Sequence, residues 1–463
     1  MTNKKPKWIM SAPIMINLEI IDSCNIKCRH CYNFWREDSV KHVKKFTKDM
    51  FDKFLEMVIE SGVFHVVLTG GEPFLNFEVL EYGLKRLTEN GISNSVNTNL
   101  MLVTPDKIKR LRDVGLDHVL TSLNSYDPET NDYINNKKGS FDKIIKGIKV
   151  ARSEGIRVSV NMIIYQRNKN HIYDTGRFLN NLGCQRLFAT RIVPNVSIDS
   201  PEETEYKLEQ KEAQSVLDQI IRVYTDFEIN VGTLVSYPLC ILGDLEKYRP
   251  LVGRGCPAQT GNRMSVNADG IAHACVHEME GYGNIFEIGI KNAFANMKKW
   301  HDGSYLYNGC ISCDYLSVCN AGCRMVAYSH SKKMNGPDNL MLGEHKIIRP
   351  IKLPLNNKMV NAVDSGEKFI VPKRIRFRKE SGFYVINVRW ANAFPIETKI
   401  GEFLIKAQKR GIKFDKNDFN VKNREIMINL FMKDVIESAN SRISCETSAK
   451  FEGASLNPFA LPV

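Results

Sequence analysis

Residues 24–32 read CNIKCRHCY, and this stretch decides the fold of the chain of 463 residues. Its three cysteines, Cys24, Cys28 and Cys31, form a C-x3-C-x2-C row that the aromatic Tyr32 follows directly. Thiolates so close together on one loop converge readily on a single iron–sulfur cluster. A four-iron cluster takes four ligands and the row supplies three, so one iron would stay open to a small molecule.

A zinc knuckle is the alternative for this row. Zinc sites are usually built from CxxC pairs or from Cys/His quartets that close a tetrahedron. His30 is available as a fourth ligand, but it lies between two of the cysteines, where ligation would strain the loop. The spacing therefore favours an open iron–sulfur site.

The row resembles the signature of the radical S-adenosylmethionine (SAM) enzymes, and its surroundings match that family. Residues 14–20, IMINLEI, predict a strand that leads into the cysteine loop. A second predicted strand, over 66–68, runs into a threonine and a GGEP turn, as the second strand does in the family. The resemblance implies that this turn receives the amino group of SAM and that Tyr32 also contacts SAM. The residues of the turn are Gly70, Gly71, Glu72 and Pro73.

Strands and helices alternate between about residues 14 and 232, which favours a parallel α/β sheet. Helices are expected over 48–61, 77–90, 105–113 and 141–153, and strands between them over 93–98, 118–123, 157–164 and 187–192. With the resemblance, this pattern implies a partial (β/α)6 TIM-like barrel over residues 14–235.

Polar residues stand where several of these strands end, and active sites of such barrels gather at the C-terminal ends of strands. Residues 98–100, TNL, resemble the TNG motif of the family. Ser122 and Asn124 stand where relatives hold the ribose of SAM with a Ser/Asp pair. Asn161 and Arg191 complete the implied SAM contacts. The alternative for these loop residues is turn chemistry and helix capping.

A second group of cysteines lies far downstream, over 256–323. Its members are Cys256, Cys275, Cys310, Cys313, Cys319 and Cys323. The spacing is similar to the SPASM extension of radical SAM enzymes, which would occupy 250–335. That resemblance implies one auxiliary cluster on Cys256, Cys275 and Cys323, and another on Cys310, Cys313 and Cys319. A zinc ribbon is the alternative.

Two closed auxiliary clusters need eight ligands, and six convincing cysteines are present. Asp338 lies about where a last ligand is expected, and a carboxylate can complete such a site. Otherwise one or both auxiliary sites stay open. His273 and His277 flank Cys275, and we expect them to pack or donate hydrogen bonds rather than to ligate. Cys184 and Cys240 stand alone in apolar surroundings and are interpreted as inert core thiols.

The character of the chain changes after the cysteines. A basic, proline-containing linker is expected over 336–372, a small α+β domain over 373–445 and a flexible tail over 446–463. Alternation around a glycine turn at 380–382 predicts a β-hairpin, and helices are expected near 400–409 and 424–437. This pattern resembles the PqqD-like winged-helix domains that bind leader peptides. A dimerisation or capping domain is the alternative.

The composition of the chain indicates its cellular compartment and its partners. The chain is 43% hydrophobic, has no signal-peptide core and has no run of membrane-spanning length. Its twelve cysteines without an export signal indicate cluster binding in a reducing cytoplasm rather than disulfides. The net charge of +12 is scattered and without basic–aromatic interleaving, so neither nucleic acid nor a membrane is an expected partner.

The resemblance implies a radical SAM peptide maturase with a [4Fe-4S] cluster, SAM and one or two auxiliary [4Fe-4S] clusters. Its partners would be a ribosomal precursor peptide, whose leader the C-terminal domain binds, and a reductant such as flavodoxin or ferredoxin. The alternatives are an anaerobic sulfatase-maturing enzyme and a non-catalytic iron–sulfur electron carrier. An acidic residue follows the cysteine equivalent to Cys275 in sulfatase maturases, whereas Val276 follows it here.

Overall fold

The computed structural model describes residues 8–33, 43–194, 205, 208–253, 255–341, 357–418 and 424–439. Its centre is a nine-stranded sheet with the strand order β7-β6-β5-β4-β3-β2-β1-β8-β9. The strands are β1 (Met15–Glu19), β2 (His65–Thr69), β3 (Ser93–Asn97), β4 (His118–Ser122), β5 (Arg157–Ile164), β6 (Arg186–Arg191), β7 (Asn230–Gly232), β8 (Arg263–Val266) and β9 (Ala272–His273). Strands β1 to β7 are parallel neighbours in chain order, as a barrel of repeated βα units requires.

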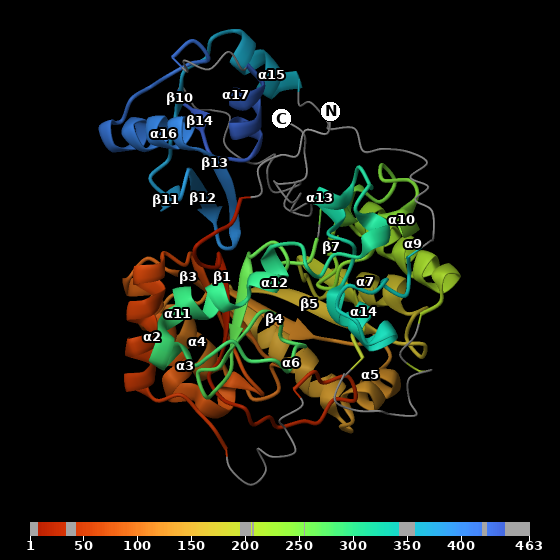
Figure 1. Ribbon diagram of the computed structural model, residues 1–463. Coiled ribbons are helices and arrows are strands. Elements are labelled where there is room, and N and C mark those ends of the chain that lie inside the picture. Colours follow the sequence, from red (N-terminus) through yellow and green to blue (C-terminus); the bar gives the residue numbers. More distant parts are fainter. Residues whose placement is uncertain are drawn as a thin grey trace.

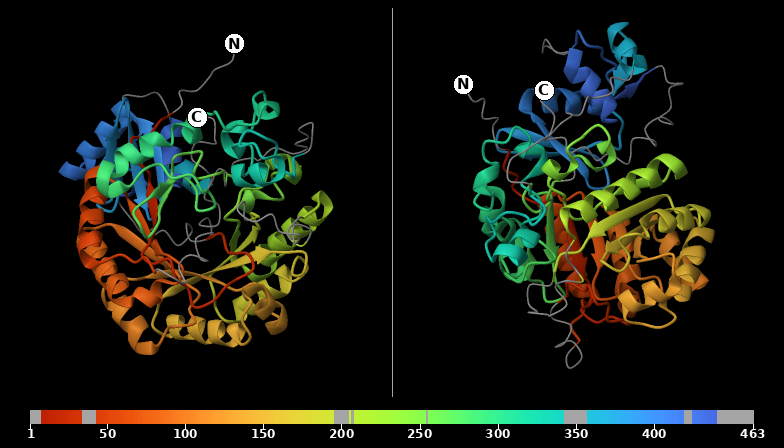
Figure 2. Two further views of the ribbon diagram at one scale, coloured as in Figure 1. Left: turned by 60° about the horizontal axis from the view of Figure 1, so that its bottom comes forward. Right: turned by 90° about the vertical axis from the view of Figure 1, so that its right-hand side faces the viewer.

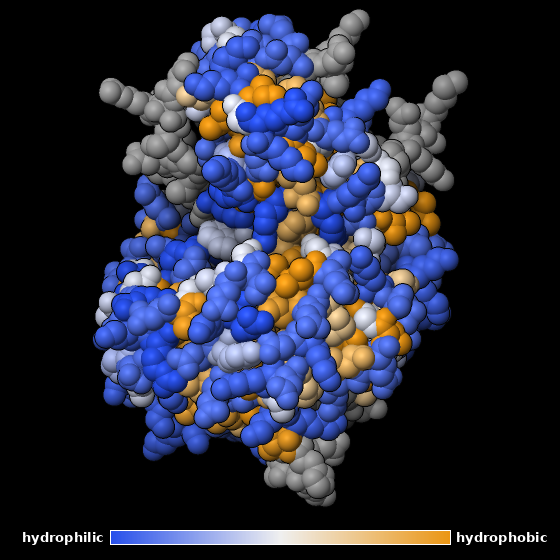
Figure 3. All heavy atoms as spheres, turned by 90° about the vertical axis from the view of Figure 1, so that its left-hand side faces the viewer, coloured by the Kyte–Doolittle hydropathy of each residue, from blue (hydrophilic) through white to orange (hydrophobic). Residues whose placement is uncertain are grey.

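Helices form a layer outside this curved sheet (Figures 1 and 2). They are α2 (Lys48–Ser61), α3 (Phe77–Glu89), α4 (Pro105–Asp113), α5 (Pro128–Asn135), α6 (Ser140–Ser153), α7 (Ile172–Asn181) and α9 (Gln210–Phe227). Local sequence explains their ends. The Thr47 side chain caps α2 by accepting from the Met50 amide, and Gly62 ends the helix in the left-handed conformation. The outer face over α2 and α3 is largely hydrophilic (Figure 3).

The predicted barrel is confirmed. The four expected helices and the expected strands lie within about a residue of their predicted bounds, whereas α5, α7 and α9 were not predicted. The cysteine-rich part continues the same sheet, because β8 pairs in parallel with β1 and β9 pairs with β8. Its helical segments are α10 (Leu239–Leu242), η2 (Arg249–Leu251), α11 (Ile285–Asn296), α12 (Lys298–His301), η3 (Asn308–Cys310), α13 (Leu316–Cys319) and α14 (Arg324–Ser331). A short 3-10 helix, η1 (Pro73–Asn76), follows β2.

The C-terminal unit has a hydrophobic core of its own, which includes Phe369, Leu404 and Phe431. Its elements are α15 (Asn357–Asp364), β10 (Phe369–Ile370), β11 (Arg376–Glu380), β12 (Phe383–Arg389), β13 (Asn392–Glu397), α16 (Thr398–Arg410), α17 (Arg424–Met432) and β14 (Glu437–Ser438). The predicted hairpin is β11–β12, and the first predicted helix is α16. The second predicted helix ends at Met432, earlier than expected, and β13 was not predicted. Much of the expected linker, 342–356, and the expected tail lie outside the described residues.

Two arginines of β11 dock this unit onto the barrel. Arg376 donates to the carbonyls of Phe64 at 2.6 Å and Gly91 at 2.7 Å. Arg378 donates to the carbonyl of Ala12 at 2.7 Å, and its charge is balanced by Glu380. The barrel partners precede β1, β2 and β3, whereas the cysteine loop follows β1. The C-terminal unit therefore sits at the end of the barrel opposite to the predicted site (Figure 1).

No helix within the described ranges combines the length and the apolar character needed to cross a membrane.

Candidate active site

The cysteine loop leaves β1 and is held by polar side chains from two other barrel units. Cys24, Cys28 and Cys31 are each half-buried. The side-chain nitrogen Nδ2 of Asn99 lies 3.9 Å from the Cys24 sulfur. The Cys28 sulfur lies 3.9 Å from the side-chain oxygen of Asn135. The structure thus places the three thiols where the chain after β3 and the end of α5 meet the loop.

The GGEP turn lies directly against the start of this loop. The Gly71 amide donates to the Ile21 carbonyl at 2.7 Å, and the Glu72 amide donates to the Ser23 carbonyl at 2.8 Å. A Cβ on Gly71 would overlap the Ser23 carbonyl, and a Cβ on Gly70 would overlap the Ile21 carbonyl. Both glycines are therefore required by the close approach of two backbones.

Glu72 joins the turn to the chain that follows β3. Its buried carboxylate accepts from the Thr98 hydroxyl at 2.7 Å, the Asn99 amide at 2.8 Å and the Phe74 amide at 3.1 Å. Burial raises the pKa of Glu72 to about 7, although these three hydrogen bonds oppose the shift. The Asn99 side chain in turn donates to the Asn25 side-chain oxygen at 2.7 Å. The TNL segment, the GGEP turn and the cysteine loop thus form one connected polar network, and Pro73 begins η1 beside it.

The SAM contacts expected after β4 and on β5 divide into two groups. Ser122 and Asn161 face each other across β4 and β5, and Asn161 accepts from the Thr190 hydroxyl at 2.7 Å. Asn124 is fully buried, donates to the Asn135 side chain at 2.9 Å and accepts from the Ile163 amide at 2.9 Å. Through these hydrogen bonds Asn124 ties the α5 region to β5.

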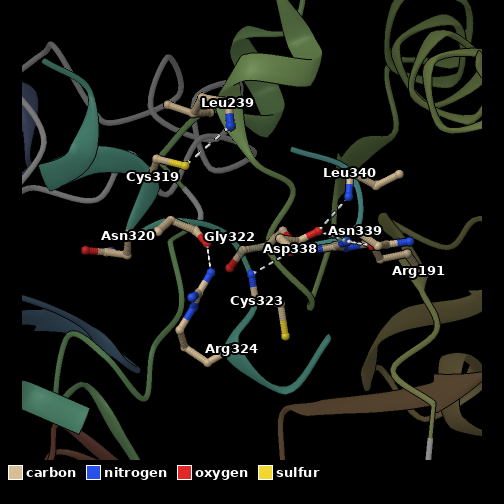
Figure 4. Close-up of polar contacts among 12 residues, drawn as sticks. Arg191, Leu239, Cys319, Asn320, Gly322, Cys323, Arg324, Asp338, Asn339 and Leu340 are labelled. Atoms are coloured by element: carbon tan, nitrogen blue, oxygen red, sulfur yellow. Dashed lines mark hydrogen bonds and ion pairs between the residues drawn. The ribbon is translucent and has the colours of Figure 1, made fainter. Parts of the chain in front are cut away.

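Arg191 and Asp338 form a buried ion pair (Figure 4). The Arg191 guanidinium donates to both Asp338 oxygens, one at 2.8 Å, and to the Ser236 carbonyl. Asp338 also accepts from the amides of Cys323 at 3.0 Å and Leu340 at 3.1 Å. The donors of Arg191 are thus taken up by Asp338 and the Ser236 carbonyl, and the carboxylate of Asp338 is surrounded by protein donors.

Cys256, Cys275 and Cys323 are buried and close enough to influence one another. Burial, together with the neighbouring thiols of Cys256 and Cys323, raises the pKa of Cys275 to about 12. His277 places Nδ1 3.7 Å from the Cys275 sulfur, and its ring centroid lies 5.2 Å from that of Tyr32. Tyr32 of the cysteine loop therefore reaches the neighbourhood of this second set of thiols.

His273 lies within hydrogen-bonding distance of a backbone carbonyl. Its Nδ1 lies 2.8 Å from the Glu280 carbonyl. The ring of His30, the alternative ligand of the first loop, lies 6.0 Å from that of Tyr165.

Cys310, Cys313 and Cys319 line one pocket, together with a residue that sequence reasoning set aside. Cys240, on the short helix α10, lines the same pocket. Cys240 was interpreted as an inert core thiol because its sequence neighbours are apolar. No local pattern in the sequence indicates that Cys240 lies near a group of cysteines some seventy residues downstream.

Within the described ranges, no three His, Cys, Asp or Glu side chains are grouped as a bound metal ion would need. The donor chemistry of the predicted sites is nonetheless uniform, because each set offers only thiols of cysteine. Such all-thiol sets are the usual ligands of iron–sulfur clusters, and they fit the clusters that the fold implies.

Comparison with known proteins agrees with this geometry. Residues 18–179 match the model of the radical SAM superfamily. The AdoMet-dependent heme synthase of Methanosarcina barkeri is 26% identical over 339 residues, which cover 69% of this chain and 93% of that protein. The mycofactocin maturase MftC of Mycobacterium tuberculosis is 24% identical over 357 residues, 73% of this chain and 86% of MftC.

Among solved structures, Streptococcus suis SuiB bound to its precursor peptide SuiA is similar in fold. The TM-score is 0.57 at 18% sequence identity, over 71% of this chain and 76% of SuiB. SuiB has also been solved with bound S-adenosylmethionine.

The fold and the cysteine loop define a radical SAM protein. Residues 18–179 form a radical SAM domain, and enzymes with such a domain use a [4Fe-4S] cluster and SAM.

Proposed function

We propose that the chain is a cytoplasmic radical SAM maturase that removes hydrogen from a ribosomal precursor peptide and leaves a crosslink or an oxidised residue. The observation that carries the proposal is the direct hydrogen bonding between the GGEP turn and the three-cysteine loop. An electron carrier has no use for such a turn beside its thiols. Two further sets of thiols distinguish the chain from radical SAM proteins that need a single cluster.

The residues of the first site have separable tasks. Cys24, Cys28 and Cys31 would hold the [4Fe-4S] cluster by three irons. Bound there and reduced, the cluster would supply one electron for the cleavage of SAM to methionine and 5′-deoxyadenosine, with a hydrogen atom taken from a C–H bond of the substrate. Gly70 and Gly71 let the backbone approach SAM closely, and Glu72 fixes that backbone through its buried hydrogen bonds.

The downstream thiols serve the second half of the reaction. Clusters held by these cysteines supply an acceptor for one electron. The peptide gives one hydrogen atom to the deoxyadenosyl group and then one proton and one electron, so it becomes lighter by two hydrogens. The starting electron comes from an external reductant, for which flavodoxin or ferredoxin is the natural class.

Two features support a peptide as the substrate. MftC is named as a maturase, and SuiB was solved with a precursor peptide. The C-terminal unit adds a three-stranded antiparallel sheet with its own core, and such a sheet can accept a leader peptide as an added strand. The basic residues of the chain would favour an acidic leader.

A sulfatase-maturing activity is the second candidate, and one contact weakens it. Val276 occupies the position after Cys275 where sulfatase maturases have an acidic residue. The nearest carboxylate along the chain, Glu278, is buried and accepts from the Tyr282 hydroxyl at 2.8 Å and the Trp300 indole at 3.0 Å. Glu278 is thus fixed within the protein rather than presented to a substrate.

The test is an anaerobic assay of the reconstituted, reduced protein with SAM and a small peptide encoded beside its gene. We expect 5′-deoxyadenosine and a peptide lighter by two hydrogens. Cys24→Ala should abolish both products, and Cys184→Ala, which changes a core thiol, should retain both. Deoxyadenosine formation that persists in Cys24→Ala would refute the assignment of the first site. An unmodified peptide beside deoxyadenosine would refute that peptide as substrate and direct the assay to a sulfatase peptide.

A further inference from the structure

We propose that Cys240 is the fourth thiolate ligand of the auxiliary cluster on Cys310, Cys313 and Cys319, and that it closes this site. The inference deepens the proposed function, since it needs iron–sulfur clusters in the downstream cysteines. It replaces the carboxylate ligand that the sequence suggested with a thiol from a separate segment.

The four thiols surround one pocket, and they come from three places in the chain. Cys240 lies on α10, Cys310 ends η3, and Cys319 ends α13. Leu239 and Met341 also line the pocket. Among the described residues around it, the potential ligands of the Cys, His, Asp and Glu types are these cysteines alone. Four thiols around one cavity match the ligand count of a closed [4Fe-4S] cluster.

A backbone hydrogen bond fixes α10 beside the pocket. The Leu239 amide donates to the Cys319 sulfur at 3.4 Å (Figure 4). Hydrogen bonds to cluster sulfurs are one of the means by which proteins tune iron–sulfur sites. The residue after Leu239 is Cys240, so this bond holds the fourth thiol next to the third. The pairing is difficult to explain if α10 only fills space.

On α10, Cys240 packs differently from the residues beside it in the sequence. Leu239, Ile241 and Leu242 belong to the main hydrophobic cluster of the protein, but Cys240 does not, although only 5% of its surface is exposed. Cys184 provides the contrast. It is equally secluded, with 3% exposed, and it belongs to that cluster. The two solitary cysteines therefore have different surroundings. Of the two, it is Cys240 that lines a pocket with other thiols.

The competing ligand is committed elsewhere. Both oxygens of Asp338 are bound by Arg191 and by the backbone amides of Cys323 and Leu340. Closing the second auxiliary site with Cys240 leaves the first with the three cysteines Cys256, Cys275 and Cys323. The two sites then differ in kind. The closed one is suited to passing electrons, and the three-cysteine one keeps an iron free for a ligand.

The experiment compares three single variants of the full chain, reconstituted anaerobically with iron and sulfide. Cys240→Ala removes the proposed ligand, Cys310→Ala removes a ligand from the same pocket, and Cys184→Ala is the matched control for loss of a buried thiol. Iron and sulfide content, Mössbauer spectra and electron paramagnetic resonance spectra are recorded for each. None of these readouts depends on turnover, so they stay informative if the peptide assay fails.

We expect Cys240→Ala and Cys310→Ala to show the same defect. Either up to a third of the iron of a three-cluster protein is lost, or one cluster converts to a three-iron form on mild oxidation. Cys184→Ala should match the unaltered protein. If Cys240→Ala matches Cys184→Ala instead, the proposal is overturned. Stoichiometric zinc in place of iron at this pocket would also overturn it.

A second measurement guards against misfolding of the variant. A small added thiol such as 2-mercaptoethanol fits the space left by the missing side chain and should restore the four-thiolate spectrum of Cys240→Ala. No such recovery is expected for a protein that has simply lost its fold. Failure of the thiol to alter the spectrum of a folded Cys240→Ala protein would contradict direct ligation.

Discussion

At the scale of single residues, Glu72 shows how a family motif is used as structure. Its carboxylate is buried and receives three hydrogen bonds from the chain around β3 and η1. Burial is the larger effect and raises the pKa of Glu72 from 4.5 to about 7. A carboxyl whose folded pKa is raised holds its proton more tightly in the folded state. The stability that it contributes is complete below pH 4.5 and is lost as the pH rises through about 7.

The replacement Glu72→Gln should remove this pH dependence. Between about pH 4.5 and 7 the unaltered apoprotein should lose about 3 kcal/mol of unfolding free energy relative to Glu72→Gln. The measurement is anaerobic denaturant unfolding of both proteins at several pH values. Parallel pH profiles would contradict the raised pKa of Glu72 and would mean that its hydrogen bonds cancel the effect of its burial.

The Arg191–Asp338 pair allows a second prediction at this scale. Asp338→Asn leaves a buried guanidinium without its counter-charge and should cost about 3–5 kcal/mol of stability. We expect the iron content to stay unchanged, because both oxygens of Asp338 are already bound by protein donors. Replacing both members, Arg191→Met with Asp338→Leu, should recover most of the loss. If Asp338→Asn lost iron while it was still folded, Asp338 would have to be a cluster ligand.

At the scale of elements, the decisive contact is between the turn after β2 and the loop after β1. Gly71→Ala places a methyl group on the Ser23 carbonyl and must push the turn away from the cysteines. A displacement of about 1 Å in a positioned site can cost roughly a hundredfold in rate. We therefore expect SAM cleavage to fall by about that factor.

The matched control for this change is Gly281→Ala. There an added Cβ meets only a side-chain methyl group of Ile271, at 2.7 Å, on an exposed turn. The rate of 5′-deoxyadenosine formation should stay close to that of the unaltered protein. A similar fall in both variants would show that the effect of Gly71→Ala is general destabilisation.

The elements also show what sequence can and cannot foresee. Helices α2, α3, α4 and α6 of the barrel were predictable because their caps and apolar periods are local, as Thr47 and Gly62 illustrate for α2. Strand β13 was missed because Pro395 interrupts its pattern, and proline is confined to edge strands such as this one. The thiol of Cys240 and the partner of Asp338 were missed because both depend on contacts between distant segments.

At the scale of the whole molecule, the C-terminal unit should be separable from the radical chemistry. Its core is formed by residues from α15 onward, so deletion of residues 357–463 removes it completely. Modification of the peptide should fall at least tenfold, whereas formation of 5′-deoxyadenosine without peptide should persist. The comparison of the two rates in one preparation is the measurement. An equal fall in both rates would indicate that the unit only stabilises the barrel through contacts such as Trp8 with Phe383.

The docking of β11 on the N-terminal rim of the barrel also constrains the length of a substrate. Strands β1 to β6 have five to eight residues, so the barrel is roughly 17–27 Å tall. An extended peptide spans about 3.4 Å per residue. A precursor held at the rim by its leader therefore needs at least about five to eight residues before the first atom that can reach the cysteine loop. Shortening that spacer should leave binding of the leader intact but stop modification of the peptide abruptly. The enzyme would then act as a molecular ruler.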